Sequence, residues 1–111
     1  MDIFDQLQAV ADSKQRETFE LPTGGILTFE ELSASDFVRL QAEMDPHQKA
    51  RDFSTVNALT IVNCCIELRE DKEKALEIVK GWPRTIQADA VLVCGRINGI
   101  TDNLPDHEKK A

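Results

Sequence analysis

The chain has 111 residues, of which 41% are hydrophobic and 30% are charged. This composition is typical of a single soluble globular domain and is too apolar for a disordered chain. Its 13 Lys and Arg residues against 20 Asp and Glu residues give a formal net charge of −7. We expect no nucleic-acid partner, because a protein that neutralises phosphates needs the opposite sign.

The predicted elements begin with a short helix and a β-hairpin. Asp2 caps the helix, whose apolar residues fall on one face: Ile3, Phe4, Leu7, Val10 and Ala11. On both sides of the turn PTGG, apolar and polar residues alternate, which predicts a hairpin at about residues 18–30. One face carries Phe19, Leu21, Leu27 and Phe29, and the opposite face carries Thr18, Glu20, Thr28 and Glu30.

The hairpin has two interpretations. Its apolar face can cover one end of a helical core, or its free edge can accept a strand from a partner. The four apolar residues on one face favour the cover. A phosphate-binding role for Gly24-Gly25 is disfavoured, because no Lys follows the glycines and the chain continues as a strand.

Two further helices are predicted in the middle of the chain. Residues 33–36, SASD, fit a capping box, which predicts a helix from Ala34 to Asp45-Pro46 and then a polar connection. Asp52 or Ser54 caps the next helix, which is apolar nearly all round as far as Leu68 and is therefore expected to be central. Its polar stripe is interpreted as an exposed edge rather than a partner-facing ladder: Asn57, Thr60 and Asn63.

The last two helices lie on either side of the break Trp82-Pro83. Asp71 caps the first of them, and Gly81 ends it. The final helix begins at Thr85 and ends at Asn98-Gly99, with these side chains expected to face inwards: Ile86, Val91, Leu92, Cys94 and Ile97. The pattern predicts an α+β fold that is mostly α-helical, with four to five helices and one N-terminal β-hairpin.

We expect one domain over residues 1–111. Residues 1–17 form the N-terminal helix and connection, residues 18–100 the hairpin and helical core, and residues 101–111 a flexible tail. The first ten residues are acidic and amphipathic, unlike a signal peptide, and no apolar run approaches the roughly 20 residues of a membrane span. These features predict a cytoplasmic protein without a membrane partner.

No residues are arranged for catalysis or for binding a metal or cofactor. The acidic residues cluster near element ends, where capping and solvation explain them, and no Cys-His pair, GxSxG or HExxH occurs. The three cysteines lie among apolar residues without ligand spacing, so we expect reduced thiols in the core: Cys64, Cys65 and Cys94. The expected function is binding, not catalysis.

From about Thr18 to Ile100 the chain contains, in this order, FELPTGGILTFEEL, LSASDFVRLQAEMD, NALTIVNCCIEL and WPRTIQADAVLVCGRINGI. This order of motifs resembles the tail assembly chaperones of long-tailed bacteriophages and their prophage relatives. It implies a non-enzymatic protein that keeps the tape measure protein soluble, engages the tail tube protein, and is absent from the mature virion. The family has no catalytic residues to carry over. The alternative is an acidic helical adaptor or regulatory module unrelated to phage.

Partner contacts are expected at apolar residues near breaks in the chain. Phe53, Trp82 and Ile86 are the candidates, although the same residues can instead close the core. Weak self-association of the protein is also compatible with these apolar residues.

A further expectation concerns Lys109 and Lys110. Tail assembly chaperones of this kind commonly exist in two lengths, the longer made by a −1 ribosomal slip near the end of the first frame, and A-AAA-AAG is a slippery heptanucleotide that encodes Lys-Lys. The alternative interpretation is a charged terminus that aids solubility.

Overall fold

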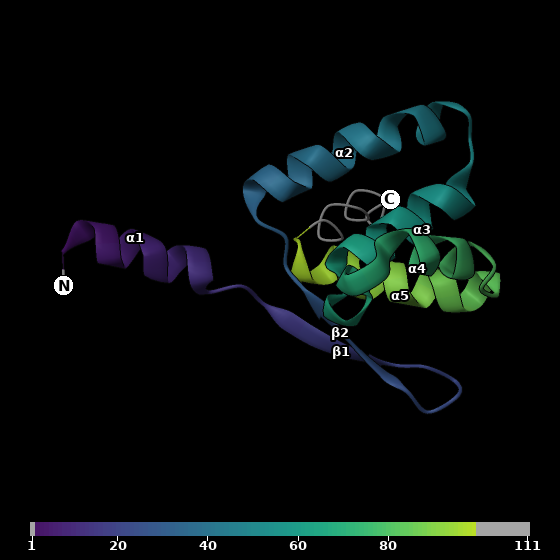
Figure 1. Ribbon diagram of the computed structural model, residues 1–111, viewed down its shortest axis with the longest axis horizontal. Coiled ribbons are helices and arrows are strands. Elements are labelled where there is room, and N and C mark those ends of the chain that lie inside the picture. The colour runs from purple at the N-terminus through teal and green to yellow at the C-terminus, as the bar shows by residue number, and fades with distance from the viewer. Residues whose placement is uncertain (1, 100–111) are drawn as a thin grey trace, which may run out of the picture.

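The computed structural model describes residues 2–99 of the chain. These residues form five α-helices, one 3-10 helix and a two-stranded antiparallel sheet, which confirms the predicted fold class. In chain order (Figure 1) the elements are α1 (Ile3–Asp12), β1 (Arg16–Glu20), β2 (Ile26–Glu30), α2 (Ala34–Lys49), α3 (Phe53–Cys64), η1 (Ile66–Asp71), α4 (Lys72–Lys80) and α5 (Arg84–Ile97). Across residues 2–99, no helix has the length and apolar character needed to cross a membrane.

The hairpin covers the helical core, as predicted. Its register pairs Phe19 with Leu27 and Glu17 with Phe29, which places the apolar side chains on one face. Leu27 and Phe29 are buried in the main core, and Phe19 and Leu21 pack against it half-exposed. The ring centroids of Phe19 and Phe29 lie 5.9 Å apart.

Glu30 is buried although it alternates with the apolar residues of β2. Only 8% of the residue is exposed, because the Arg16 and Arg69 guanidinium groups cover its carboxylate at 2.8 and 3.1 Å. The two arginines lower the pKa of Glu30, with the hydrogen bond from Arg16 as the largest cause. Burial in this charged form requires both partners.

Helix α2 does not end at Asp45-Pro46 as predicted but continues to Lys49. Pro46 has no N–H to donate to the preceding turn, yet its own carbonyl accepts the Ala50 N–H at 3.1 Å. An ion pair between Asp45 and Lys49 at 3.1 Å spans the same turn. The chain reverses only at Arg51, whose φ of 60° lies in the left-handed region.

Helix α3 is central, as predicted, but it ends at Cys64 rather than continuing to Leu68. Cys65 leaves the helix because its backbone forms an isolated bridge with Phe29. The Glu67 carboxylate then accepts the Thr28 N–H at 2.7 Å and its hydroxyl at 2.9 Å. Pairing with the hairpin therefore breaks the helix, while η1 carries the chain on to α4.

The residues around α3 form two apolar clusters. In the main cluster α3 packs on α4, α5 and the hairpin, through side chains that include Ile61, Val62, Val79 and Ala90. In the smaller cluster α2 packs on α3 through Leu40, Met44, Val56 and Leu59.

Two expectations about side-chain placement are wrong. The stripe predicted as an exposed edge is half-buried: Asn57 donates to the Gln87 side chain at 3.2 Å, and Asn63 accepts from Lys72 at 3.0 Å. Leu92, expected to face inwards, is 54% exposed. Inward positions of α5 are taken instead by small or polar residues such as Gln87, Ala90 and Gly95.

Candidate functional site

An apolar hollow lies where the tip of the hairpin meets the junction of α4 and α5. Its volume is about 310 Å³, and it is lined by Leu21, Pro22, Thr23, Trp82, Pro83 and Ile86. In the sequence, Trp82 and Ile86 lie near a break in the chain. The tertiary structure brings them together with the hairpin turn, although Pro22 in that turn is 60 positions before Trp82. Tightly spaced apolar side chains in an open hollow are typical of a site that accepts apolar side chains of a partner.

The junction of α4 and α5 is shaped by backbone hydrogen bonds. Trp82 donates its N–H to the Val79 carbonyl at 3.0 Å, which closes the end of α4. Pro83 then starts α5, since its carbonyl accepts the N–H groups of Ile86 and Gln87 at 3.1 Å. Trp82 and Ile86 are therefore held less than two turns apart, both half-exposed, on either side of a rigid proline.

The hairpin side of the hollow is a tight turn. The Leu21 N–H donates to the Gly25 carbonyl at 2.7 Å, and the Gly24 N–H donates to the Leu21 carbonyl at 2.8 Å. Gly24 has a φ of 100°, which residues with a Cβ rarely adopt. Leu21 packs against the core while Pro22 and Thr23 stay exposed at the rim.

Gln87 fastens this end of the molecule from inside. Its buried side-chain amide donates to the Val79 carbonyl at 3.0 Å and to the Ser54 carbonyl at 3.3 Å. It thereby joins the start of α3, the end of α4 and the first turn of α5. No pattern in the sequence predicts this role, because a glutamine in a helix gives no signal of the distant carbonyl groups to which it will donate.

Phe53 does not line the hollow, unlike the two candidates predicted with it. It is the first residue of α3 and is 52% exposed. Through Gln87 and Ser54 it lies at the same end of the helical body as the α4–α5 junction. The structure thus brings Trp82 and Ile86 into one site and leaves Phe53 as a separate exposed side chain near it.

The chemistry of the hollow suits binding. Its lining has no acid, base or thiol, and Thr23 is its only side chain with a hydroxyl. Beside the hollow, Arg84 is exposed and forms no ion pair with any other residue from 2 to 99. Lys80 at the end of α4 lies 3.5 Å from Glu77. Because Lys80 is paired, Arg84 is the cation that leaves an unpaired positive charge beside the α5 side of the hollow.

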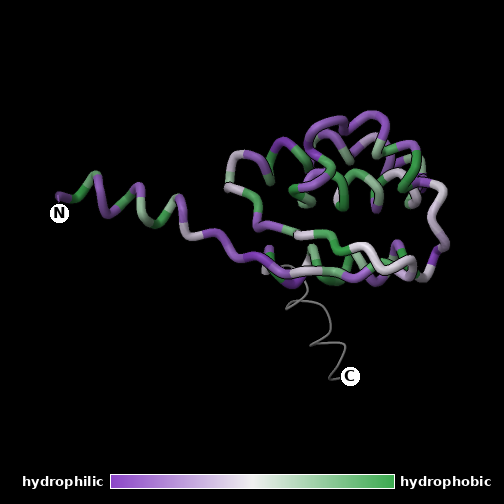
Figure 2. The backbone as a smooth tube through the Cα atoms, turned by 60° about the horizontal axis from the view of Figure 1, so that its bottom comes forward, coloured by the Kyte–Doolittle hydropathy of each residue, from purple (hydrophilic) through white to green (hydrophobic). Residues whose placement is uncertain are grey.

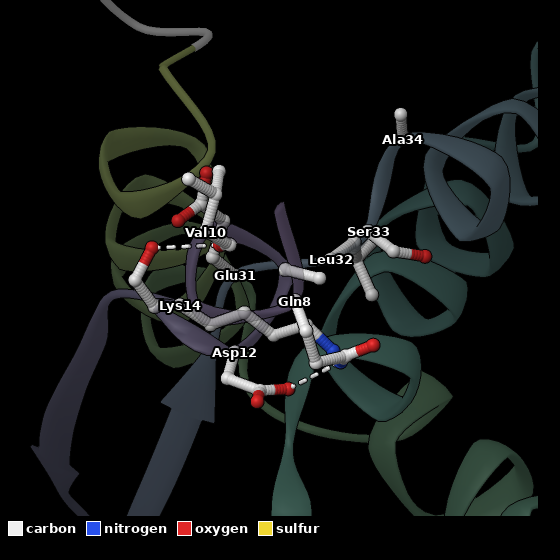
Figure 3. A pocket seen from close by; sticks show the side chains of 10 residues that line it. Gln8, Val10, Asp12, Lys14, Glu31, Leu32, Ser33 and Ala34 are labelled. Carbon is white, nitrogen blue, oxygen red and sulfur yellow. Dashed lines mark hydrogen bonds between the residues drawn. The ribbon is translucent and has the colours of Figure 1, made fainter. Parts of the chain in front are cut away.

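A larger hollow, of about 580 Å³, lies between the end of α1 and the start of α2 (Figure 3). Its lining mixes apolar and polar side chains from α1 and from the segment that leads into α2. Gln8 donates to Asp12 at 3.0 Å, and the Ser13 hydroxyl donates to the Val10 carbonyl at 2.7 Å, so these polar groups of α1 and its cap are already hydrogen-bonded.

The three thiols are buried, as predicted for the core. Burial raises the pKa of Cys65 to about 11. Cys94 has its pKa raised by its hydrogen bond with Cys64 and by burial. Within residues 2–99, no group of three or more His, Cys, Asp or Glu side chains could hold a metal ion.

No protein-family model, curated protein or solved structure matches the chain. A proposal about function therefore depends on the order of motifs in the sequence and on the geometry of the hollow. Lys109 and Lys110 lie outside the residues that the structure describes.

Proposed function

We propose that this protein is a non-enzymatic chaperone of phage or prophage tail assembly. In this role it binds the tape measure protein and the tail tube protein in the host cytoplasm and is absent from the mature virion. The observation that carries the proposal is the apolar hollow at the hairpin tip, which combines Leu21 and Pro22 with Trp82 and Ile86. The order of motifs from Thr18 to Ile100 supports the same role.

The hollow suits a helical client with an apolar stripe. A stripe at positions i, i+3 and i+4 presents side chains close enough together to enter one hollow. Trp82 supplies the large aromatic surface that dominates many protein interfaces, and it is half-exposed. The net charge of −7 favours the solubility of the chaperone with its bound client.

Capture of the tape measure protein, whose gene the proposed role expects to follow this one, tests the proposal. Ile86→Asp puts a charge in the hollow and is expected to weaken capture of that protein at least about tenfold, which corresponds to roughly 1.4 kcal/mol. Leu92→Asp is the matched control, because Leu92 lies on the same helix, is exposed and does not line the hollow. It should bind as the wild type does. Phe53→Asp shows whether the neighbouring exposed phenylalanine extends the site.

Thermal melting of each variant separates a binding defect from unfolding. If Ile86→Asp lowers the melting temperature in proportion to the lost capture, the hollow is part of the core and the interface assignment is wrong. If the wild type captures neither the tape measure protein nor the tail tube protein, the adaptor alternative replaces the chaperone. The codons of Lys109 and Lys110 independently test the two-length product, since non-slippery codons there would exclude it.

A further inference from the structure

Helix α1 is an amphipathic helix with nothing packed on its apolar face. None of its residues is buried, and its large apolar side chains are 57–74% exposed: Ile3, Phe4, Leu7 and Val10. Figures 1 and 2 show it extending away from the body as a separate arm. A ten-residue helix is too short to be stable in water alone, because its nucleation cost is not recovered. The apolar face therefore needs a surface to cover it.

The charges of α1 indicate the kind of surface that fits. The helix and its cap carry Asp2, Asp5 and Asp12, with no Lys or Arg from residue 2 to residue 13. Asp2 accepts the Asp5 N–H and Asp12 accepts from Gln8, and no described cation pairs with any of the three. Two copies of α1 packed together would bring like charges close, which disfavours that pairing. An apolar surface with an unpaired cation beside it fits instead.

The hollow at the hairpin tip has this character. Its lining is largely apolar, and Arg84, which is exposed and forms no ion pair within residues 2–99, follows Pro83 directly. It also lies at the far end of the body from α1. Arg96, near the end of α5, pairs with Glu17 at the base of the hairpin, whereas the start of α5 meets the hairpin tip. The α1 arm and the hollow therefore lie at opposite ends of the folded molecule.

The short connection opposes docking of α1 into the hollow of its own chain. Gln15 is bound to Glu31 by two hydrogen bonds, of 2.8 and 3.0 Å, so the hairpin ladder continues to the edge of the connection. Ser13 closes the end of α1 through its N–H and its hydroxyl. Only Lys14 lies between these two fixed points. Reversing the helix onto the hairpin would break bonds at one of them.

We propose that α1 of one copy docks into the hairpin-tip hollow of a second copy. Phe4 and Leu7 enter the hollow against Trp82 and Ile86, and Asp5 pairs with Arg84. Because the two contacting surfaces differ, the contact is heterologous, and repeating it produces a ring or an open chain of copies. The inference does not depend on the proposed function, since it concerns the protein alone.

Sedimentation of the purified full chain over a wide concentration range tests the proposal. The wild type should show a mass that increases with concentration, and Phe4→Asp and Ile86→Asp should each remain monomeric. Val38→Asp, an exposed apolar position on α2, is the matched control and should associate as the wild type does. Arg84→Asp should weaken association, and Asp5→Arg in the same chain should restore it.

Mixing two deficient variants distinguishes this contact from others. Phe4→Asp retains its hollow and Ile86→Asp retains its arm, so an equal mixture should form a 1:1 dimer although each variant alone is monomeric. If Phe4→Asp abolishes association while Ile86→Asp and Arg84→Asp do not, the arms pair with one another and the proposed contact is wrong. A wild-type chain that stays monomeric at every concentration overturns the proposal, including the case in which α1 folds onto its own body.

Discussion

Helices α1 and α3 are built from similar local signals but have opposite surroundings. Each begins at an aspartate whose carboxylate accepts a backbone N–H, Asp2 from Asp5 and Asp52 from Thr55. Each is rich in apolar residues, which form one stripe on α1 and lie nearly all round α3. Yet α3 buries seven of its 12 residues, and α1 buries none of its ten. The local pattern therefore determines whether a helix can form, whereas the elements packed around it determine what its apolar residues contribute to stability.

The largest expected difference between the two helices is in thiol reactivity. At a low protein concentration, where copies are separate, Leu7→Cys on α1 should react with a thiol reagent at the rate of a free cysteine. Cys64, Cys65 and Cys94 are buried and should react only when the core opens, at least about a thousandfold more slowly at neutral pH. The raised pKa of Cys65 adds to its protection. Rapid modification of the native thiols under non-denaturing conditions would show that the core around α3 is looser than described.

The next largest effect is expected for Ile61→Ala at the centre of α3. Ile61 is completely buried in the main cluster, so the substitution should lower the free energy of unfolding by about 2–5 kcal/mol. Urea unfolding followed by circular dichroism measures this change. A loss below 1 kcal/mol, as is typical of surface substitutions, would place Ile61 at a surface and remove the contrast with α1.

A smaller effect that depends on pH is expected for Glu30→Gln. The carboxylate hydrogen-bonds to Arg16 and Arg69, two partly exposed side chains, so the substitution should cost about 1–2 kcal/mol at neutral pH. The pKa of Glu30 is lowered in the folded state from its ordinary value of 4.5. Its contribution is therefore present above pH 4.5 and is lost as the pH falls through the lowered pKa.

Urea unfolding of the wild type and Glu30→Gln at several pH values checks this expectation. The two stabilities should differ at pH 7 and converge at acid pH. Arg39→Gln provides a control at an exposed ion pair, with Asp36, where little change is expected. If the difference in stability between the two proteins does not change with pH, the pKa of the Glu30 carboxylate is not lowered by folding.

The smallest effect is expected for Leu7→Ala on α1. The side chain is 57% exposed and contacts no core cluster, so the free energy of unfolding of the isolated chain should change by less than about 0.5 kcal/mol. Unfolding measured at low protein concentration avoids any contribution from association. At high concentration the same substitution should destabilise the assembly, because Leu7 then lies in the proposed contact. A client bound in the hollow should displace α1 from it. Leu7→Ala should then no longer destabilise the protein at high concentration.

Much of the local structure follows from the sequence because its causes lie within a few residues. Ser33 and Asp71 cap α2 and α4 as predicted, each accepting the N–H three residues later at 3.1 Å. The alternation around the turn PTGG defines the hairpin and its apolar face. The pairing of Trp82 with Ile86 is also local, since Pro83 separates two helices whose ends carry these side chains. Capping, alternation and proline geometry need no distant partner.

The remaining features were decided by contacts between segments that are far apart in the chain. Cys65 ends α3 because its backbone pairs with Phe29, and Glu30 is buried because Arg69 reaches it from η1. Half of the hollow comes from the hairpin turn at Pro22, which no pattern around Trp82 can indicate. In each case the energy of a distant contact exceeds a weak local preference, since one residue's helix propensity is worth less than about 1 kcal/mol. The exposure of α1 has the same origin: an apolar stripe specifies a face to be covered, and only the tertiary arrangement decides whether the chain itself supplies the cover.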